Sequence, residues 1–113
     1  MDNKTKGKRG EELAKLHYQQ AGYEILETNY RYGRAEIDLI VLYREKLLVF
    51  VEVKTRSRKD FGTAETFVSD RQQERIREAA EDYIFGINWL KDIRFDILCV
   101  DQKEEVEVFE DAF

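Results

Sequence analysis

The sequence lacks proline, and its 113 residues contain a single cysteine and a single tryptophan. The lone Cys99 cannot form an internal disulfide, and its place in the apolar run 97–100 indicates a buried small side chain. No apolar run is long enough to cross a membrane as a helix, and no apolar signal core follows the basic N-terminal residues. We therefore expect one cytoplasmic domain over residues 1–113, with no membrane partner.

Basic residues are outnumbered by acidic ones, but the imbalance is confined to one end of the chain. The net charge is −5, and residues 101–113 alone carry six acids and one base, which leaves residues 1–100 neutral. We expect residues 1–9 to form a flexible basic arm. Two further basic clusters are expected to contact a phosphate backbone. Their members are Arg31, Arg34, Arg56, Arg58 and Lys59. A solvated loop without a partner is the alternative for the cluster that ends at Lys59.

Two neighbouring segments, 35–41 and 47–54, are rich in Val, Ile, Leu and Phe, which favours β-strands. Because side chains alternate across a strand, Glu36 and Asp38 are expected on one face and Ile37 on the other. If the two segments form an antiparallel pair joined by a short loop, apolar residues face each other only in one register. In that register the numbers of opposing residues sum to 90.

The same register places Asp38 opposite Glu52 and Glu36 opposite Lys54. Opposed Cβ atoms lie about 5 Å apart, so two carboxylates require a cation between them or a proton on one of them. Mg²⁺ suits this position because it prefers hard oxygen ligands and binds through few carboxylates. Lys54 would then orient an attacking water or stabilise charge on a phosphate. The alternative is a Glu36–Lys54 salt bridge, with Asp38 at a hydrated strand end.

The remaining patterns predict two helices and three more strands. The first helix is expected to begin near Gly10 and to end at Gln20. Ser69 and Gln72 form a capping box at the start of the second, which carries an apolar stripe and which Gly86 ends. The further strands are expected at residues 23–30, 94–100 and 105–109. The result is an α/β fold bordering on α+β, with a central mixed sheet of about five strands flanked by two helices.

This order of elements, with acids on the second strand and Glu-x-Lys on the third, resembles the restriction-endonuclease-like core of PD-(D/E)xK nucleases. A closer resemblance is to the bacterial YraN-type family of endonuclease-like proteins. Each motif is weak alone, but together, in order and at these intervals, they are specific. The matching residues are Gly10-Glu11-x-x-Ala14, Gly22-Tyr23, Asn29, Glu36-Ile37-Asp38-Leu39-Ile40, Phe50-Val51-Glu52-Val53-Lys54-x-Arg56, Phe61-Gly62, Arg94-Phe95-Asp96 and Ala112-Phe113.

The resemblance implies a metal-dependent nuclease. Asp38 and Glu52 are similar to the metal-binding acids of the superfamily, with the Val53 carbonyl as a further ligand to Mg²⁺ or Mn²⁺, and Lys54 is similar to the catalytic lysine. The implied reaction is hydrolysis of phosphodiester bonds in nucleic acid, above all in branched or structured DNA, as in DNA repair or recombination. Resolvases of this fold act as dimers, which is compatible with a homodimer here.

Further roles follow from the same resemblance. Glu11 is similar in position to the first-helix acid of archaeal Holliday-junction resolvases, which implies an outer-shell or second-metal ligand, and Glu36 would orient Lys54. Two residues depart from the family pattern: Ala35 replaces a glycine, and Gln72 stands where relatives carry a lysine. The missing lysine favours weaker substrate binding. A non-catalytic nucleic-acid-binding module on the same fold is therefore one alternative, and a protein-interaction domain that uses its acidic edge strand is another.

Overall fold

The computed structural model describes residues 3–55 and 68–113, which form one mixed sheet and two helices. This confirms the predicted five-stranded mixed sheet with two helices, and the segregated elements place the fold in the α+β class. No helix in the described ranges is both long enough and apolar enough to cross a membrane. The elements are α1 (Asn3–Gln20), β1 (Tyr23–Tyr32), β2 (Ala35–Tyr43), β3 (Leu47–Thr55), α2 (Asp70–Ile87), β4 (Asp92–Val100) and β5 (Val106–Phe109).

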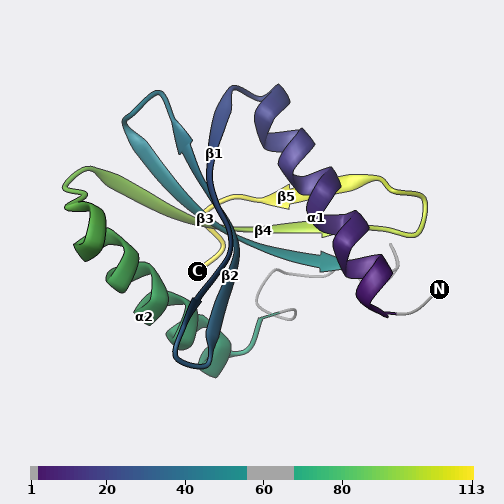
Figure 1. Ribbon diagram of the computed structural model, residues 1–113. Helices are drawn as coiled ribbons and strands as arrows, with labels where there is room; N and C mark the ends of the chain where they lie inside the picture. Colours follow the sequence, from purple (N-terminus) through teal and green to yellow (C-terminus); the bar gives the residue numbers. More distant parts are fainter. Residues whose placement is uncertain (1–2, 56–67) are drawn as a thin grey trace.

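The strands follow one another across the sheet in sequence order, β1-β2-β3-β4-β5 (Figure 1). All neighbours are antiparallel except β3 and β4, which run parallel. A parallel pair needs a long crossover connection, and the connection between β3 and β4 contains α2. This topology brings α2 back over the sheet, so that its N-terminal turn lies near the ends of β2 and β3.

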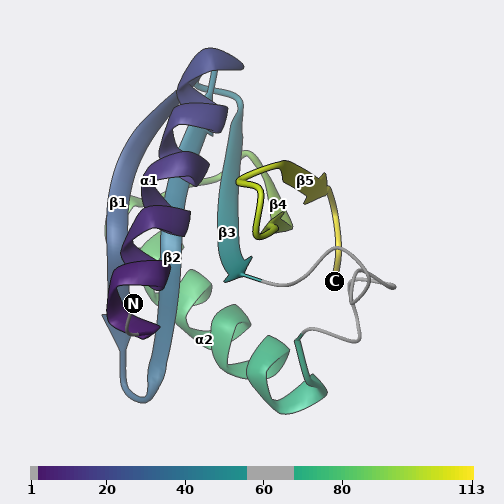
Figure 2. The same ribbon diagram turned by 90° about the vertical axis from the view of Figure 1, so that its right-hand side faces the viewer.

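The two helices pack on opposite faces of the sheet, which gives three layers (Figure 2). On one face α1 contributes Ala14 and Tyr18 to a core with Leu39 and Val51. On the other face α2 buries the stripe that the sequence predicts. The buried members of that stripe are Ile76, Ala79, Ala80 and Tyr83. Because the central strands are covered on both sides, they are apolar along nearly their whole length.

The predicted register of β2 and β3 is confirmed where the two strands pair. Ile40 faces Phe50 and Leu42 faces Leu48, and the ladder extends as far as Leu39 opposite Val51. Beyond that pair the regular ladder stops. The ladder therefore ends one residue before the predicted Asp38–Glu52 pair, so the two carboxylates stand where the strands begin to separate.

Alternation along β2 is broken just before this point. Ile37 packs in the same core cluster as Ile40, three residues away, so it does not share the face of Leu39 as predicted. The β1–β2 pairing skips Asn29 and Asp38, and Asn29 has φ of 52°, in the left-handed region. A left-handed residue in one strand locally re-aims the side chains of its neighbours. The sequence pattern carries no sign of this irregularity.

Two predicted helix boundaries are also wrong. The first helix begins at Asn3 instead of near Gly10, so it includes residues 3–9 of the expected basic arm. The second helix passes through Gly86 and ends at Ile87, where Asn88 adopts a left-handed conformation and its N–H bonds back to Ile84 and Phe85. Asparagine tolerates that conformation better than most residues, so it can end a helix as glycine does.

A buried polar network holds α1 and the C-terminal segment to β4. The Asp96 carboxylate is fully buried and accepts hydrogen bonds from the Tyr18 hydroxyl at 2.8 Å and from Arg94 Nε at 2.7 Å. The backbone N–H of Asp111 also donates to Asp96, at 3.2 Å. Phe113 stacks on Phe95 with ring centroids 5.1 Å apart. These contacts give a structural role to the matching residues Arg94, Phe95, Asp96 and Phe113.

Candidate functional site

The site begins at Asp38, at the point where β2 and β3 separate. Its Oδ2 atom accepts a hydrogen bond of 2.7 Å from the Val53 backbone N–H. A side chain thus replaces the backbone acceptor that the interrupted ladder would have supplied, and this satisfies the Val53 amide. The bond turns the Asp38 carboxylate toward β3, beside the half-buried end of that strand.

Asp38 and Glu52 perturb each other strongly. Burial is the main reason that the pKa of Asp38 rises to about 6, and the charges of Glu11 and Glu36 raise it further while the Val53 N–H lowers it. Burial likewise raises the pKa of Glu52 to about 8, and the nearby Asp38 charge adds to this effect. Two carboxyl groups that are both desolvated and mutually repulsive retain a proton at neutral pH. The predicted juxtaposition of like charges is therefore present.

Lys54 forms its ion pair with Glu52 and not with Glu36, which the predicted register placed opposite it. Its Nζ lies 3.5 Å from Glu52 Oε1, and both side chains are nearly buried, with exposed fractions of 18% and 10%. The Lys54 charge lowers the pKa of Glu52 and so partly opposes the effect of burial. Glu36 instead forms an ion pair with Arg31 across the β1–β2 ladder, at 3.6 Å. The expectation that Glu36 pairs with Lys54 and orients it is wrong, because the strands separate before that position.

Glu11 reaches the same region from α1. A Cβ atom at residue 10 would lie 3.2 Å from Thr55 Oγ1, so Gly10 allows the helix to approach the end of β3 closely. With its amide oriented to satisfy both neighbours, Asn29 donates hydrogen bonds of 2.9 Å to Glu11 Oε1 and to Glu36 Oε1. Asn29, to which the sequence assigned no role, therefore holds two acids beside Asp38.

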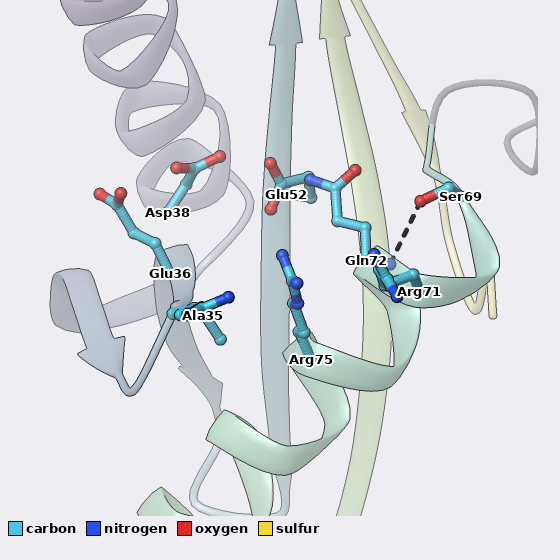
Figure 3. Close-up of a pocket in the computed structure, with 9 residues that line it drawn as sticks. Ala35, Glu36, Asp38, Glu52, Ser69, Arg71, Gln72 and Arg75 are labelled. Atoms are coloured by element: carbon cyan, nitrogen blue, oxygen red, sulfur yellow. Dashed lines mark hydrogen bonds between the residues drawn. The ribbon is translucent and has the colours of Figure 1, made fainter.

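An open cavity of about 410 Å³ lies between this end of the sheet and the N-terminal turn of α2 (Figure 3). Figure 3 shows Gln72 and Arg75 extending from α2 toward Glu52, with Asp38 and Glu36 on the far side. The lining residues are Arg34, Ala35, Glu36, Asp38, Glu52, Ser69, Arg71, Gln72 and Arg75. The cavity therefore presents carboxylates from the sheet to guanidinium and amide groups from the helix.

The N-terminal turn of α2 is the part of the site that the sequence did not reveal. Ser69 caps the helix as predicted, because its Oγ accepts from the Gln72 N–H at 3.2 Å. The Gln72 side chain lines the cavity instead of completing the capping box. Arg71 and Arg75 are four residues apart and thus lie on the same helical face as each other. That spacing is a visible signal, but only the fold shows that the face is turned toward the carboxylates.

The structure brings together most, but not all, of the predicted residues. Arg34 lines the cavity, whereas Arg31 is outside its lining and pairs with Glu36. The predicted phosphate contacts Arg56, Arg58 and Lys59 fall outside the described residues. Within the described part of the chain, no group of three or more His, Cys, Asp or Glu side chains is arranged to hold a metal ion. The charge of Glu11 acts on Asp38 and raises its pKa.

Fold and site together define an α+β domain with a coupled carboxyl pair and a neighbouring lysine at the open end of two central strands. A model of the family described as "Uncharacterised protein family UPF0102" matches residues 10–100. The chain belongs to this family, which is the YraN-type family that its motifs resemble. The matched range includes α1 from Gly10 onward, all of the carboxyl site and the cavity-lining part of α2.

Several bacterial relatives align over most of the chain. A UPF0102 protein of Flavobacterium psychrophilum is 44% identical over 110 residues, which cover 95% of this chain and 92% of the relative. A UPF0102 protein of Cytophaga hutchinsonii is 39% identical over 104 residues, which cover 92% of this chain and 91% of the relative. A relative from Corynebacterium efficiens is 45% identical over 91 residues, covering 80% of this chain and 73% of its own.

Proposed function

We propose that this protein is a metal-dependent nuclease of the restriction-endonuclease-like superfamily, which hydrolyses phosphodiester bonds in DNA of branched or otherwise structured form. The observation that carries the proposal is the Asp38–Glu52 pair, in which both pKa values are raised, with the Lys54 ammonium 3.5 Å from Glu52. Strongly perturbed groups that converge beside a cavity are typical of functional sites. Their residue types and their order along the chain agree with the Asp, Glu-x-Lys pattern of the superfamily.

The donor set fits Mg²⁺ or Mn²⁺. Asp38 and Glu52 offer carboxylate oxygens whose mutual repulsion a divalent cation would relieve, and the Val53 carbonyl is the third ligand that the superfamily pattern suggests. Two carboxylates with water and substrate oxygens are a usual environment for Mg²⁺, which seldom has an all-protein cage. When bound, the ion would polarise the phosphate and lower the pKa of a coordinated water.

The chain's own residues have separate tasks in this proposal. Lys54 holds a positive charge beside Glu52, where it stabilises negative charge that develops on the phosphate or orients the attacking water. Glu11 and Glu36 keep the local potential negative and thereby favour cation binding at Asp38. Arg34 in the cavity, together with Arg31 and the basic segment that contains Arg56, Arg58 and Lys59, positions the nucleic acid strand through its phosphates.

A second candidate is a nucleic-acid-binding module on the same fold that does not cleave. It is favoured by Gln72, a neutral side chain in the cavity at the position where the family resemblance implies a lysine. It is also favoured by the finding that no set of three acidic or other metal-binding side chains is gathered within residues 3–55 and 68–113. The two candidates differ in one measurable respect, namely strand cleavage that requires both a divalent cation and Asp38.

The test is a cleavage assay with Mn²⁺ or Mg²⁺ across four-way junction, flap, single-stranded and duplex DNA, with matched RNA substrates. Asp38→Asn and Glu52→Gln are expected to lower the cleavage rate at least about 100-fold, which corresponds to about 2.7 kcal/mol of transition-state stabilisation. Glu45→Gln, in the exposed turn between β2 and β3, removes one acidic charge far from the site and should cleave as wild type does.

Each outcome decides between the candidates. Asp38-dependent cleavage supports the nuclease, and DNA binding without cleavage in any metal supports the binding module. Cleavage by Asp38→Asn at the wild-type rate would reject the proposed metal ligand and point to a contaminating nuclease. The oligomeric state of the DNA complex, measured by analytical ultracentrifugation, tests the homodimer that the resemblance to dimeric resolvases suggests.

A further inference from the structure

Three arginines of the cavity have no partner among the described residues, in contrast to the other arginines of that part of the chain. Arg34, Arg71 and Arg75 line the cavity, and within residues 3–55 and 68–113 none of them has an ion pair, hydrogen bond or stacked ring. Arg75 is half-buried, whereas Arg34 and Arg71 are exposed, so water or a ligand in the cavity supplies the acceptors for their guanidiniums.

The other arginines in the described part of the chain each have a partner. Arg94 makes hydrogen bonds to Asp96 and Tyr23, and Arg77 stacks over Phe95 and Phe113. The remaining partners are Glu104 for Arg9, Glu36 for Arg31 and the Tyr43 ring for Arg44. The unpartnered arginines are thus not scattered over the surface, since all three line a single cavity.

The carboxylates of the same cavity do not neutralise these arginines. Lys54 is the cation that lowers the pKa of Glu52, while no guanidinium offsets the effect of burial on either Asp38 or Glu52. In Figure 3 Arg75 extends from the second turn of α2 toward Glu52 without forming an ion pair with it. The separation leaves room for a ligand that carries negative charge on the side of α2.

We propose that Arg34, Arg71 and Arg75 form a phosphate-binding wall that holds one phosphate of a nucleic acid strand across the cavity from the carboxyl pair. Arginine suits this task because its planar fork donates two parallel hydrogen bonds to phosphate oxygens. Two elements supply the wall, since Arg34 comes from the β1–β2 turn and the other two from the first two turns of α2. This assignment rests on the proposed function for the nature of the ligand.

The arginines of the wall would also supply the phosphate contact that the lysine expected at position 72 would otherwise make. Gln72 lies between Arg71 and Arg75 in sequence and lines the same cavity, so cationic donors flank it. The phosphate can be an internal diester of the strand or a terminal monoester, and both present the same oxygens to the guanidiniums. A terminal monoester carries about one additional negative charge near neutral pH and would bind the wall more tightly.

The test measures binding of fluorescent single-stranded oligonucleotides, with a 5′-phosphate or a 5′-hydroxyl, to Arg75→Gln protein in EDTA, where cleavage that needs metal is absent. Arg75→Gln is expected to weaken binding about 5- to 20-fold and to reduce the slope of log affinity against log salt by about 1. Arg44→Gln, in the turn at the opposite end of β2, removes the same charge and should change neither quantity by more than about twofold. Thermal melting of both variants checks that each remains folded.

The outcomes separate the wall from the nuclease. A selective loss in Arg75→Gln supports the wall whether or not the wild type cleaves DNA with Mn²⁺, and a larger loss for the 5′-phosphorylated strand identifies a terminal phosphate as its ligand. Equal losses in Arg75→Gln and Arg44→Gln would overturn the wall, because net charge alone would then explain them. Cleavage by wild type with no dependence of binding on Arg75 would also overturn it and leave the proposed function in place.

Discussion

The coupled carboxyl pair makes the stability of the metal-free protein depend on pH in an unusual direction. Burial raises the pKa of Asp38 to about 6 and that of Glu52 to about 8, from ordinary values of 3.8 and 4.5, and nearby charges add to it: Glu11 and Glu36 act on Asp38, and Asp38 acts on Glu52. Well below pH 3.8 both groups are protonated in folded and unfolded chains alike, so the shifts have no effect there. As pH rises toward 8, the unfolded chain loses both protons first, and the folded state becomes progressively less favoured.

The size of the effect follows from the number of protons. Between pH 6 and 8 the folded pair keeps about one proton that the unfolded chain has released, which gives a slope of about −1.4 kcal/mol per pH unit. The free energy of unfolding should therefore fall by about 2–3 kcal/mol across this range because of the pair alone. Glu52→Gln removes the titrating group and the charge that repels Asp38, so its slope should be much flatter. At pH 8 we expect this variant to be more stable than the wild type.

The assay is urea unfolding in EDTA at pH 6, 7 and 8, with the slopes of wild type, Glu52→Gln and the distant control Glu45→Gln compared. Groups outside the site titrate alike in all three proteins, so their contribution drops out when the slope of one protein is subtracted from that of another. Addition of Mg²⁺ at about ten times its dissociation constant should restore about 1.4 kcal/mol to the wild type at pH 8 and little to Glu52→Gln. Parallel pH profiles for wild type and Glu52→Gln would refute the inferred coupling, because the pair would then titrate alike in both states.

Three further substitutions test separate parts of the structure. Tyr18→Phe removes a hydrogen bond to the fully buried Asp96 carboxylate and should lower the free energy of unfolding by about 1–3 kcal/mol in urea titrations. Ser69→Ala removes the N-cap of α2 and should cost about 1 kcal/mol in the same assay, with weaker oligonucleotide binding if the helix end frays. Lys54→Met removes the cation that lowers the pKa of Glu52, so an NMR titration of the Glu52 side-chain carboxyl should show a higher pKa than in wild type. An unchanged or lower pKa would show that the Lys54–Glu52 contact is not maintained in solution.

Binary patterning was enough to predict the centre of the sheet. The register of β2 and β3 follows from apolar alternation between Ile40 and Leu48, and the structure confirms it as far as the pattern is regular. The pattern fails between Ile37 and Leu39, which pack in opposite cores beside the left-handed Asn29 of the neighbouring strand. Side-chain alternation alone cannot reveal such an irregularity, since it arises from the local backbone conformation.

The residues of the candidate site also fall into two groups, those that the sequence predicts and those that only the fold reveals. Asp38, Glu52 and Lys54 could be predicted because neighbouring strands bring them together and the spacing along each strand is local. Arg71 and Arg75 could not, because they lie on a crossover helix, and sequence spacing does not show where that helix packs relative to the carboxylates. Glu36 was misassigned for a related reason. The strands separate before residue 54, which leaves the Glu36 side chain to pair with Arg31 instead.

The electrostatics of the cavity favour a ligand that combines both signs of charge. The carboxyl pair is repulsive and partly protonated because no cation within the described residues compensates it fully, while Arg34, Arg71 and Arg75 in the same cavity have no anionic partner there. A divalent cation at the carboxyl pair, together with a phosphate against the arginines, would compensate both sets of charges without bringing the arginines and carboxylates together. This is the ligand that the proposed function and the proposed wall together predict.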